Sequence, residues 1–461
     1  MGWGRGLLAL AIGLAVLAAL DGGLRLAGAL PPDDPLLFFA RTREPRVDPF
    51  VEVAPGRLAI RPDWVNDGVG LRGRRGQRAG RQFLLPGFRP AEIVRKKPEG
   101  ALRVVALGDS TAYGLYVGGD AAFPARLGSE LARQTGRSVE ALNLGCAGFA
   151  SDRVLALLPT ALALGPDLVV VYVGHNEMLG GSEGPAAGLS PALRLRAGLL
   201  AHSALFAWLD HAWTRALRAT ETERVREEAA AVEAGEIPTF VPEAVPASQR
   251  VAPPAAFRAR AAQRYRANLE AMVAAGRAAG VPILFVLPVE NLRWPPGLSF
   301  HAQGFAQQKE FDAALRAAAA LREAGRPDRA LAEIERAIAL SPEHAMARYE
   351  HAELLEQLGR ADEARSEFRA AIDRDGVTHR LTTPLEAVFL GVMSREETPW
   401  IDLRERMRSD SSDAVARQLF VDHVHPTAYG HAEIAEQMTA SALFLLASQA
   451  RATSAQTGGA R

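Results

Sequence analysis

Five short apolar runs constrain the fold of this chain more than any other feature of its sequence. They are predicted to form buried strands and lie at 103–107, 138–144, 168–173, 282–287 and 400–403. Helical patterns lie between or after most of them, at 121–135, 151–163, 257–279 and 427–447. Apolar strands that alternate with amphipathic helices are typical of a parallel sheet covered on both faces. The sequence therefore predicts an α/β fold of three layers, α/β/α, around a parallel five-stranded sheet.

The first of four polar motifs, Gly108-Asp109-Ser110, follows the first predicted strand. In open α/β sheets, ligands bind at the carboxyl ends of the strands, so chemistry is expected at this position. A serine that leads from a strand into a helix has an exposed hydroxyl, and its backbone N–H faces a region that favours negative charge. A nucleophile needs both properties. Taken alone, the tripeptide is also compatible with a helix N-cap or a turn.

Two further motifs end the next two strands and offer hydrogen-bond donors. Asn143-Leu144-Gly145-Cys146-Ala147-Gly148 presents unobstructed glycine N–H groups, and Gly174-His175-Asn176-Glu177 offers the side-chain amide of Asn176. Donors of this kind stabilise an oxyanion without changing their own charge. Each motif alone is also compatible with an ordinary loop. Cys146 has no histidine adjacent in sequence and is predicted to be a small buried thiol.

The fourth motif, Asp422-His423-Val424-His425-Pro426, lies just before the last predicted helix and is the most specific. A carboxylate three residues before a histidine, on one tight turn, orients the imidazole and stabilises its cation. A metal site made of Asp422, His423 and His425 is the alternative, but no further cluster of His or Cys lies nearby in the sequence. We therefore expect a base with its orienting acid, and no metal.

Taken together and in this order, the four motifs resemble those of the SGNH hydrolases, also called GDSL esterases or lipases. The resemblance covers roughly 100–180, 257–290 and 398–447. It implies a flavodoxin-like α/β/α fold and ester hydrolysis without a metal or other cofactor. One position departs from the family: its third motif commonly ends in Asp, where this chain has Glu177. We expect this change to alter the support of the loop rather than to abolish activity.

Carried over residue by residue, the resemblance implies a catalytic triad and an oxyanion hole. Ser110 would be the nucleophile, His425 the base and Asp422 the acid that orients it. The oxyanion hole would consist of Ser110, Gly148 and Asn176.

Two insertions interrupt the alternation of strands and helices. The first, 178–256, combines a charged helical pattern with a proline-rich stretch and is predicted to be solvated. The second, 309–376, repeats itself with an offset of 34 residues, which is the tetratricopeptide period. The matched pairs are Gly325 and Gly359, Ala330 and Ala364, Ile334 and Phe368, and Ala337 and Ala371. Because about three repeats are needed for an independent core, these two must lean on neighbouring helices or on the hydrolase domain. The architecture that the resemblance implies places them on the catalytic side of the sheet, as a lid or a docking surface.

The N-terminus carries an apolar run from Leu7 to Leu20, preceded by Arg5. We expect residues 1–30 to be an uncleaved signal anchor or transmembrane segment, with the catalytic body on the exported, periplasmic or extracellular, side. Residues 31–100 are rich in Pro, Arg and Gly and are predicted to be an irregular connector.

The remaining boundaries follow from the strand pattern and the repeats. The hydrolase domain is predicted to span 101–308 and 377–448, interrupted by the repeats, and 449–461 to be a disordered tail. With 53 basic and 53 acidic side chains, the net charge is zero and favours no nucleic-acid partner. A single cysteine excludes an internal disulfide.

The predicted activity is hydrolysis of a carbohydrate or lipid acyl ester through an acyl-enzyme on Ser110. One alternative is an O-acetyltransferase that uses the same residues on an envelope or exported polysaccharide. The other is an interaction protein that binds a protein partner through the repeats and carries an inactive hydrolase body. Arg293 and Trp294, in the loop after the fourth strand, are candidate substrate contacts. The alternative for them is a rigid Pro-Pro loop whose tryptophan packs on the repeats.

Overall fold

The computed structural model describes residues 2–27, 46–61, 64–65, 87–178, 199, 203–210, 255–302, 304–376, 379–407 and 412–458. Its centre is a five-stranded parallel sheet with the strand order β5-β4-β6-β7-β8. The strands are β4 (Leu102–Gly108), β5 (Val139–Gly145), β6 (Leu168–Tyr172), β7 (Ile283–Leu287) and β8 (Trp400–Asp402). All five predicted strands are present. In chain order the arrangement is 2-1-3-4-5, the doubly wound order of flavodoxin-like folds.

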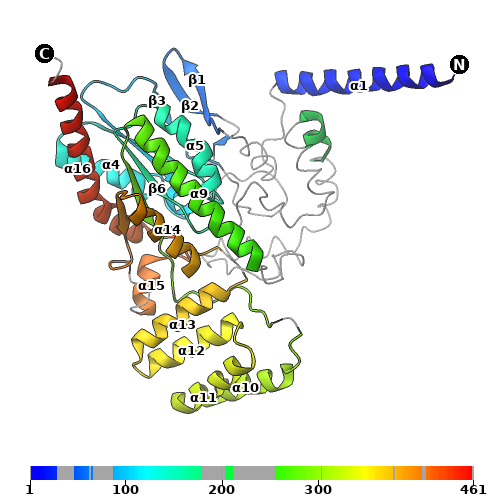
Figure 1. Ribbon diagram of the computed structural model, residues 1–461, viewed down its shortest axis with the longest axis vertical. Helices are drawn as coiled ribbons and strands as arrows, with labels where there is room; N and C mark the ends of the chain where they lie inside the picture. Colours follow the sequence, from blue (N-terminus) through cyan, green and yellow to red (C-terminus); the bar gives the residue numbers. More distant parts are fainter. Residues whose placement is uncertain are drawn as a thin grey trace.

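Helices cover both faces of this sheet and give the three predicted layers (Figure 1). One face packs on α5 (Ser151–Ala163), α9 (Ala255–Ala279) and α14 (Thr383–Arg395), and the other on α4 (Phe123–Thr135) and α16 (Ala428–Gly458). Alternate residues of β4 enter the two cores: Val105 lies in the first, and Val104 in the second. Because both faces are buried, each strand is apolar throughout rather than alternating.

The segment predicted as an irregular connector, 31–100, contains regular structure, so that prediction was wrong for residues 50–60 and 92–94. A three-stranded antiparallel sheet is formed by β1 (Phe50–Ala54), β2 (Arg57–Ile60) and β3 (Glu92–Val94). The strands are short and largely exposed, so the sequence shows no continuous apolar run there, and they pair with one another. Arg103 of β4 is fully buried and donates to the backbone carbonyls of Val94, Arg95 and Leu164.

The repeated segment forms two antiparallel helix pairs, as predicted. They are α10 (Gln308–Glu323) with α11 (Pro327–Leu340), and α12 (Ala345–Gln357) with α13 (Ala361–Arg374). The matched alanines and their apolar partners fill the space between the helices, since Ala330, Ile334, Ala364 and Phe368 share one core. Leu292, from the loop after β7, completes this core. The repeats therefore lean on the hydrolase domain, at the carboxyl end of its strands (Figure 1).

The chain ends in one long helix. A disordered tail was predicted at 449–461, but α16 continues to Gly458. The added residues include three Ala and two Gln, which are good helix formers, so the helix propagates beyond the core it covers.

The N-terminal apolar run also forms a helix, α1 (Gly2–Leu26). In the parts of the chain that the structure describes, no helix is long and apolar enough to cross a membrane. The transmembrane segment predicted for 1–30 is therefore not supported. Asp21 of α1 accepts hydrogen bonds from the Ser203 hydroxyl and the Leu205 N–H, both at 2.9 Å. The charged helix and the proline-rich stretch predicted within 178–256 lie outside the described residues.

Candidate active site

Ser110 is the first residue of α3 (Ser110–Tyr113), which follows directly on β4. Asp109 caps this helix, because its Oδ1 accepts the Thr111 N–H at 2.9 Å. The turn needs a glycine at the end of β4 and another at the end of the neighbouring strand β5. A Cβ on Gly108 would lie 2.2 Å from the carbonyl oxygen of Tyr172, and one on Gly145 would lie 2.3 Å from the Tyr113 nitrogen. The sequence thus brings the Ser110 hydroxyl to the point where the strand order reverses, between β5 and β6.

The structure brings Ser110, His425 and Asp422 into one hydrogen-bonded chain. His425 Nε2 lies 2.7 Å from Ser110 Oγ, and His425 Nδ1 lies 2.7 Å from Asp422 Oδ2. A carboxylate can only accept, so Nδ1 carries the ring proton and Nε2 is left to accept the serine hydroxyl proton. All three residues are buried, Ser110 with 8% of its surface exposed.

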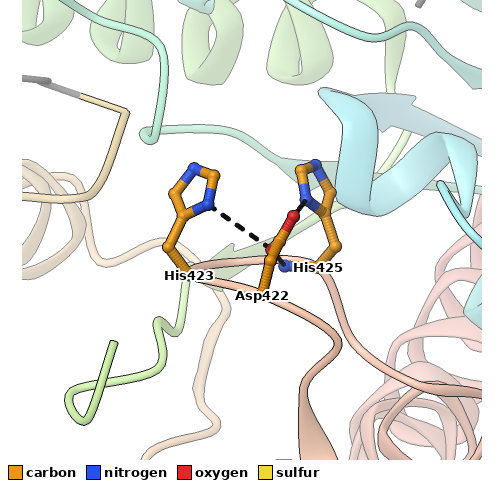
Figure 2. A group of neighbouring side chains, drawn as sticks. All are labelled: Asp422, His423 and His425. Carbon is orange, nitrogen blue, oxygen red and sulfur yellow. Dashed lines mark hydrogen bonds and ion pairs between the residues drawn. The ribbon is translucent and has the colours of Figure 1, made fainter. Parts of the chain in front are cut away.

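Asp422 is held as an anion. Burial acts to raise its pKa, but the neighbouring His425 imidazole, its hydrogen bond and His423 together hold the pKa well below its usual range. The Oδ1 atom also accepts the backbone N–H groups of Val424 at 3.0 Å and His425 at 2.9 Å. Figure 2 shows the carboxylate between the two imidazoles. The Asp422 carboxylate therefore supplies the negative charge that stabilises His425 when its imidazole is protonated.

Gly148 and Asn176, predicted for the oxyanion hole, lie on two loops that are joined by a hydrogen bond. Gly148 has φ = 77°, a left-handed conformation that favours glycine. The Asn176 side-chain amide donates to the carbonyl of Phe149 at 3.1 Å. This bond takes one of the two amide hydrogens and leaves the second for a ligand.

Glu177, the residue that departs from the family motif, supports the same loop. Its carboxylate accepts the Ser151 N–H at 2.8 Å and the Ser151 hydroxyl at 2.7 Å, at the start of α5. Burial raises the pKa of Glu177 to about 7, against the effect of these two bonds. Asn268 of α9 donates to the same hydroxyl at 2.9 Å. The two hydrogen bonds to Ser151 therefore give Glu177 the loop-supporting role that we expected for this position.

Asp109 and Cys146 are two buried groups beside the site. Burial raises the pKa of Asp109 to about 7, and among the described residues its Oδ2 has no hydrogen-bond partner. Burial also raises the pKa of the Cys146 thiol far above its usual value, and the side chain is fully enclosed. Cys146 is thus the inert buried thiol that the sequence predicts.

Asp422, His423 and His425 also form a possible metal cluster, because one ligand atom from each lies within 4.8 Å of the others. His423 Nδ1 is 3.5 Å from Asp422 Oδ1. Both ring nitrogens of His425, however, are already engaged by Asp422 and Ser110. A metal ion would have to displace one of these partners, so the geometry favours the triad over a metal site.

Arg293 was predicted to contact substrate, and the structure assigns it to other contacts. Its guanidinium forms ion pairs with Glu356 of α12 and Asp413 of α15 (Asp413–Leu419), and only 9% of the side chain is exposed. Trp294 is half-buried and lies closer to the triad, with its ring centroid 6.5 Å from that of His423. It is thus Arg293, and not the tryptophan of the alternative, that contacts the repeats, and the role of Trp294 as a substrate contact stays a prediction.

Two residues near the triad were missed in the sequence. The ring of Tyr116 lies edge-on to the His425 ring, with centroids 5.3 Å apart, and its φ of 69° is unusual for a tyrosine. Arg89 holds the loop that carries Tyr116, because it donates to the carbonyls of Tyr113, Gly114 and Val117. Arg89 comes from the segment predicted as a connector, and no local sequence pattern marks it.

Comparison with known families gives two matches. The model of the GDSL-like Lipase/Acylhydrolase family matches residues 106–328, and that of the Tetratricopeptide repeat matches 315–376. The first range contains Ser110, Gly148 and Asn176 and ends before Asp422 and His425. Both parts of the resemblance found in the sequence are thereby confirmed, as is the expected class of enzyme, an ester-bond hydrolase. No curated protein matches the chain significantly.

Several solved structures are similar at low identity. A crystal structure of TesA is 13% identical, with 74% of this chain and 99% of that chain covered and a TM-score of 0.31. A GDSL-like lipase from Bacteroides thetaiotaomicron is 10% identical, with 74% and 86% covered and a TM-score of 0.30. An acetyl xylan esterase, AlAXEase, is 10% identical, with 74% and 99% covered and a TM-score of 0.32. At these TM-scores the assignment rests on the family match.

Proposed function

Residues 106–328 belong to the GDSL-like lipase and acylhydrolase family, and from this premise we propose that the protein is a serine esterase. Ser110 is its nucleophile, His425 its general base and Asp422 the acid that orients the base. The observation that carries the proposal is the chain of two 2.7 Å contacts from Ser110 Oγ through the imidazole to the Asp422 carboxylate.

In the first half of the reaction, Ser110 Oγ attacks the carbonyl carbon of the ester while its proton passes to His425 Nε2. The resulting oxyanion is held by the N–H groups of Ser110 and Gly148 and by the free hydrogen of the Asn176 amide. Collapse of this intermediate releases the alcohol, which takes the proton from His425, and leaves an acyl-serine.

In the second half, a water molecule gives a proton to His425 Nε2 and attacks the acyl carbonyl. A second oxyanion forms in the same hole and collapses, the acid leaves, and Ser110 regains its proton from His425. Asp422 stays ionised throughout, because its low pKa and its bonds to backbone N–H groups suit it to stabilise the transient imidazolium.

The proposed substrate is an acyl ester of a carbohydrate or a lipid, and the proposed location is the exported side of a membrane. The location rests on the apolar N-terminal run alone. Protease treatment of intact cells checks it: degradation of the catalytic body is the expected result, and full protection would contradict it.

The catalytic proposal is tested with the full chain, p-nitrophenyl acetate and a fluorophosphonate probe. Ser110→Ala should abolish both hydrolysis and labelling. Ser129→Ala, which removes an exposed hydroxyl of α4 that bonds to the carbonyl of Ala125, should change neither. Hydrolysis or labelling that survives in Ser110→Ala would exclude Ser110 as the nucleophile. If an added oligosaccharide receives acetyl groups faster than water does, the result would favour an acetyltransferase that uses the same residues.

A further inference from the structure

The loop between β7 and α10 connects the repeats to the triad, and we propose that Arg293 in this loop is a positioning residue. Through it, the repeat helices hold the turn that carries Asp422 and His425 in its reactive geometry. This inference rests on the proposed function, because it assigns a role to the repeats in the same reaction.

The first link joins the loop to the triad turn. The backbone N–H of Asn291 donates to the carbonyl of His423 at 2.8 Å, and its side-chain amide donates to the carbonyl of Asp422 at 3.3 Å. Asn291 is itself buried. The backbone around Asp422 is therefore fixed from outside its own turn.

The second link joins the loop to the repeats. The Arg293 guanidinium pairs with Glu356 of α12 and lies 5.8 Å from the ring centroid of Phe368 in α13. The hydroxyl of Tyr349 in α12 donates to the Arg293 carbonyl at 2.6 Å. Both the side chain and the backbone of this residue are thus held by the repeats.

Arg293 also joins the two links to each other. Its backbone N–H donates to Asn291 Oδ1 at 3.0 Å, which fixes the amide that reaches Asp422. Its guanidinium also pairs with Asp413 at 3.0 Å, the first residue of α15, the helix that leads into Phe420 and Asp422. Arg293 therefore restrains the catalytic turn in two ways: through Asp413 on the helix that precedes the turn, and through Asn291, which contacts its backbone.

An arginine suits this position better than a lysine. Glu356 and Asp413 lie on different helices, and a planar guanidinium can bind two carboxylates at once with separate N–H groups. A lysine carries one compact charge and holds a single partner well. A purely structural role would require only that the repeats stay folded.

The experiment compares full-length Arg293→Ala, Arg293→Lys and Arg348→Ala in the hydrolysis of p-nitrophenyl acetate. Arg348 is the matched control, since it is also an arginine of an ion pair, but its partner at 3.0 Å, Glu367, lies inside the repeats. We expect Arg293→Ala to lower kcat about tenfold with KM changed less than about twofold, because misplacement of a catalytic group affects the chemical step. Arg293→Lys should recover part of the loss, and Arg348→Ala should keep kcat within about twofold.

Two results would overturn the inference: equal kcat values for Arg293→Ala and Arg348→Ala, or a fall in kcat that follows the fraction of unfolded protein. Glu356→Gln breaks one ion pair only, so it replaces Arg293→Ala if that variant does not fold, with the same expected change in kcat. Amide hydrogen exchange at 421–425 is read in all variants. If the wild-type chain shows no Ser110-dependent hydrolysis, the proposed function fails. Faster exchange in Arg293→Ala than in Arg348→Ala then still supports the coupling, and equal exchange refutes it.

Discussion

Asn176 combines two duties in one side chain. One of its amide hydrogens is bound to the carbonyl of Phe149, which fixes the amide in place, and the other is left for the oxyanion of the proposed reaction. A donor that is fixed before the reaction costs no reorganisation in the transition state. The loop geometry, rather than the residue type alone, makes Asn176 suitable for this duty.

Asn176→Ala should lower kcat about 100-fold and leave KM nearly unchanged, because the lost hydrogen bond is formed mainly in the transition state. Steady-state kinetics with p-nitrophenyl acetate measures both constants. Asn268→Ala is the control, since this amide donates to Ser151 on α5 and supports the same region without a role in the hole. Equal losses in the two variants would mean that Asn176 acts only by supporting the loop.

Glu177 gives the fold a pH dependence whose sign can be stated. Its pKa in the folded chain is about 7, above the ordinary value of 4.5, because burial disfavours the charged form. The folded state therefore binds a proton more tightly than the unfolded chain does. The stability this gives is fully present below about pH 4.5 and is lost as the pH rises through about 7.

Glu177→Gln should remove this loss. A glutamine can accept the Ser151 N–H and donate to the Ser151 hydroxyl, so both bonds survive. Urea unfolding should give equal stabilities at pH 4.5 and a gain of about 1–3 kcal/mol for the variant at pH 8. Glu310→Gln, on the exposed surface of α10, should show no such difference. A variant that is less stable at pH 8 would mean that the ionised carboxylate stabilises the fold.

At the triad, sequence motifs were informative because Ser110 begins a helix directly after a strand, and Asp422 and His425 lie on one turn just before the last helix. Ser110, Asp422 and His425 were placed by motifs, and the parallel sheet then brings strand ends together. Arg293 was wrong as a substrate contact, since its partners Glu356 and Asp413 lie 63 and 120 residues away. Tyr116 and Arg89 were missed for the same reason: their importance arises only from contacts made in the folded chain.

At the scale of single elements, the close approach of β5 to α3 leaves no room for a side chain at Gly145. A Cβ there would lie 2.3 Å from the Tyr113 nitrogen and 2.6 Å from the Ala112 carbonyl carbon, and backbone cannot move aside as a side chain can. Because α3 carries Ser110, crowding at Gly145 displaces the nucleophile as well as the strand.

Gly145→Ala should lower the free energy of unfolding by about 1–3 kcal/mol and reduce kcat. Gly391→Ala is the opposite case, since α14 leaves open space around that glycine. It should raise the free energy of unfolding by about 0.5–1 kcal/mol, because alanine restricts the unfolded chain and favours a helix. Chemical denaturation measures both. Equal stability of the wild type and Gly145→Ala would show that α3 can shift freely.

The accuracy of the predicted elements followed their apolar pattern rather than their length. The strands β4 to β8 and the helices α5 and α9 were found within two residues, since apolar runs and regular amphipathic patterns identify them. The sheet β1–β3 was not found, because its strands are largely exposed and carry no continuous apolar run, unlike β6 and β7, which are fully buried. The tail was called disordered although Ala-rich sequence can extend a helix beyond its core.

At the scale of the whole molecule, Arg103 connects the three-stranded sheet β1–β3 to the five-stranded sheet. Its side chain is fully buried, pairs with Glu140 of β5 at 2.7 Å, and donates to three carbonyls, those of Val94 and Arg95 at the end of β3 and that of Leu164 after α5. The strands β1 to β3 therefore form part of the hydrolase body rather than a connector lying over it.

Arg103→Met should lower the free energy of unfolding by about 3–5 kcal/mol, since it leaves buried carbonyls and Glu140 without their cation. Arg57→Met, in the exposed Arg57–Glu92 pair of the small sheet, should cost less than about 1 kcal/mol. Thermal or urea unfolding of both variants checks the contrast. A loss in Arg103→Met no larger than that in Arg57→Met would show that the small sheet is held by its apolar contacts alone.

The nucleophile and its base are separated by 315 residues, which sets an order of events during synthesis. At about 5–20 residues per second, Ser110 leaves the ribosome some tens of seconds before His425. The first sheet strands, Ser110, the donors of the oxyanion hole and the repeats are all made before the base exists. The nascent chain can thus hold an ester-binding surface without the means to cleave, and hydrolysis begins only when the turn at Asp422 has been made and has closed against the loop at Asn291.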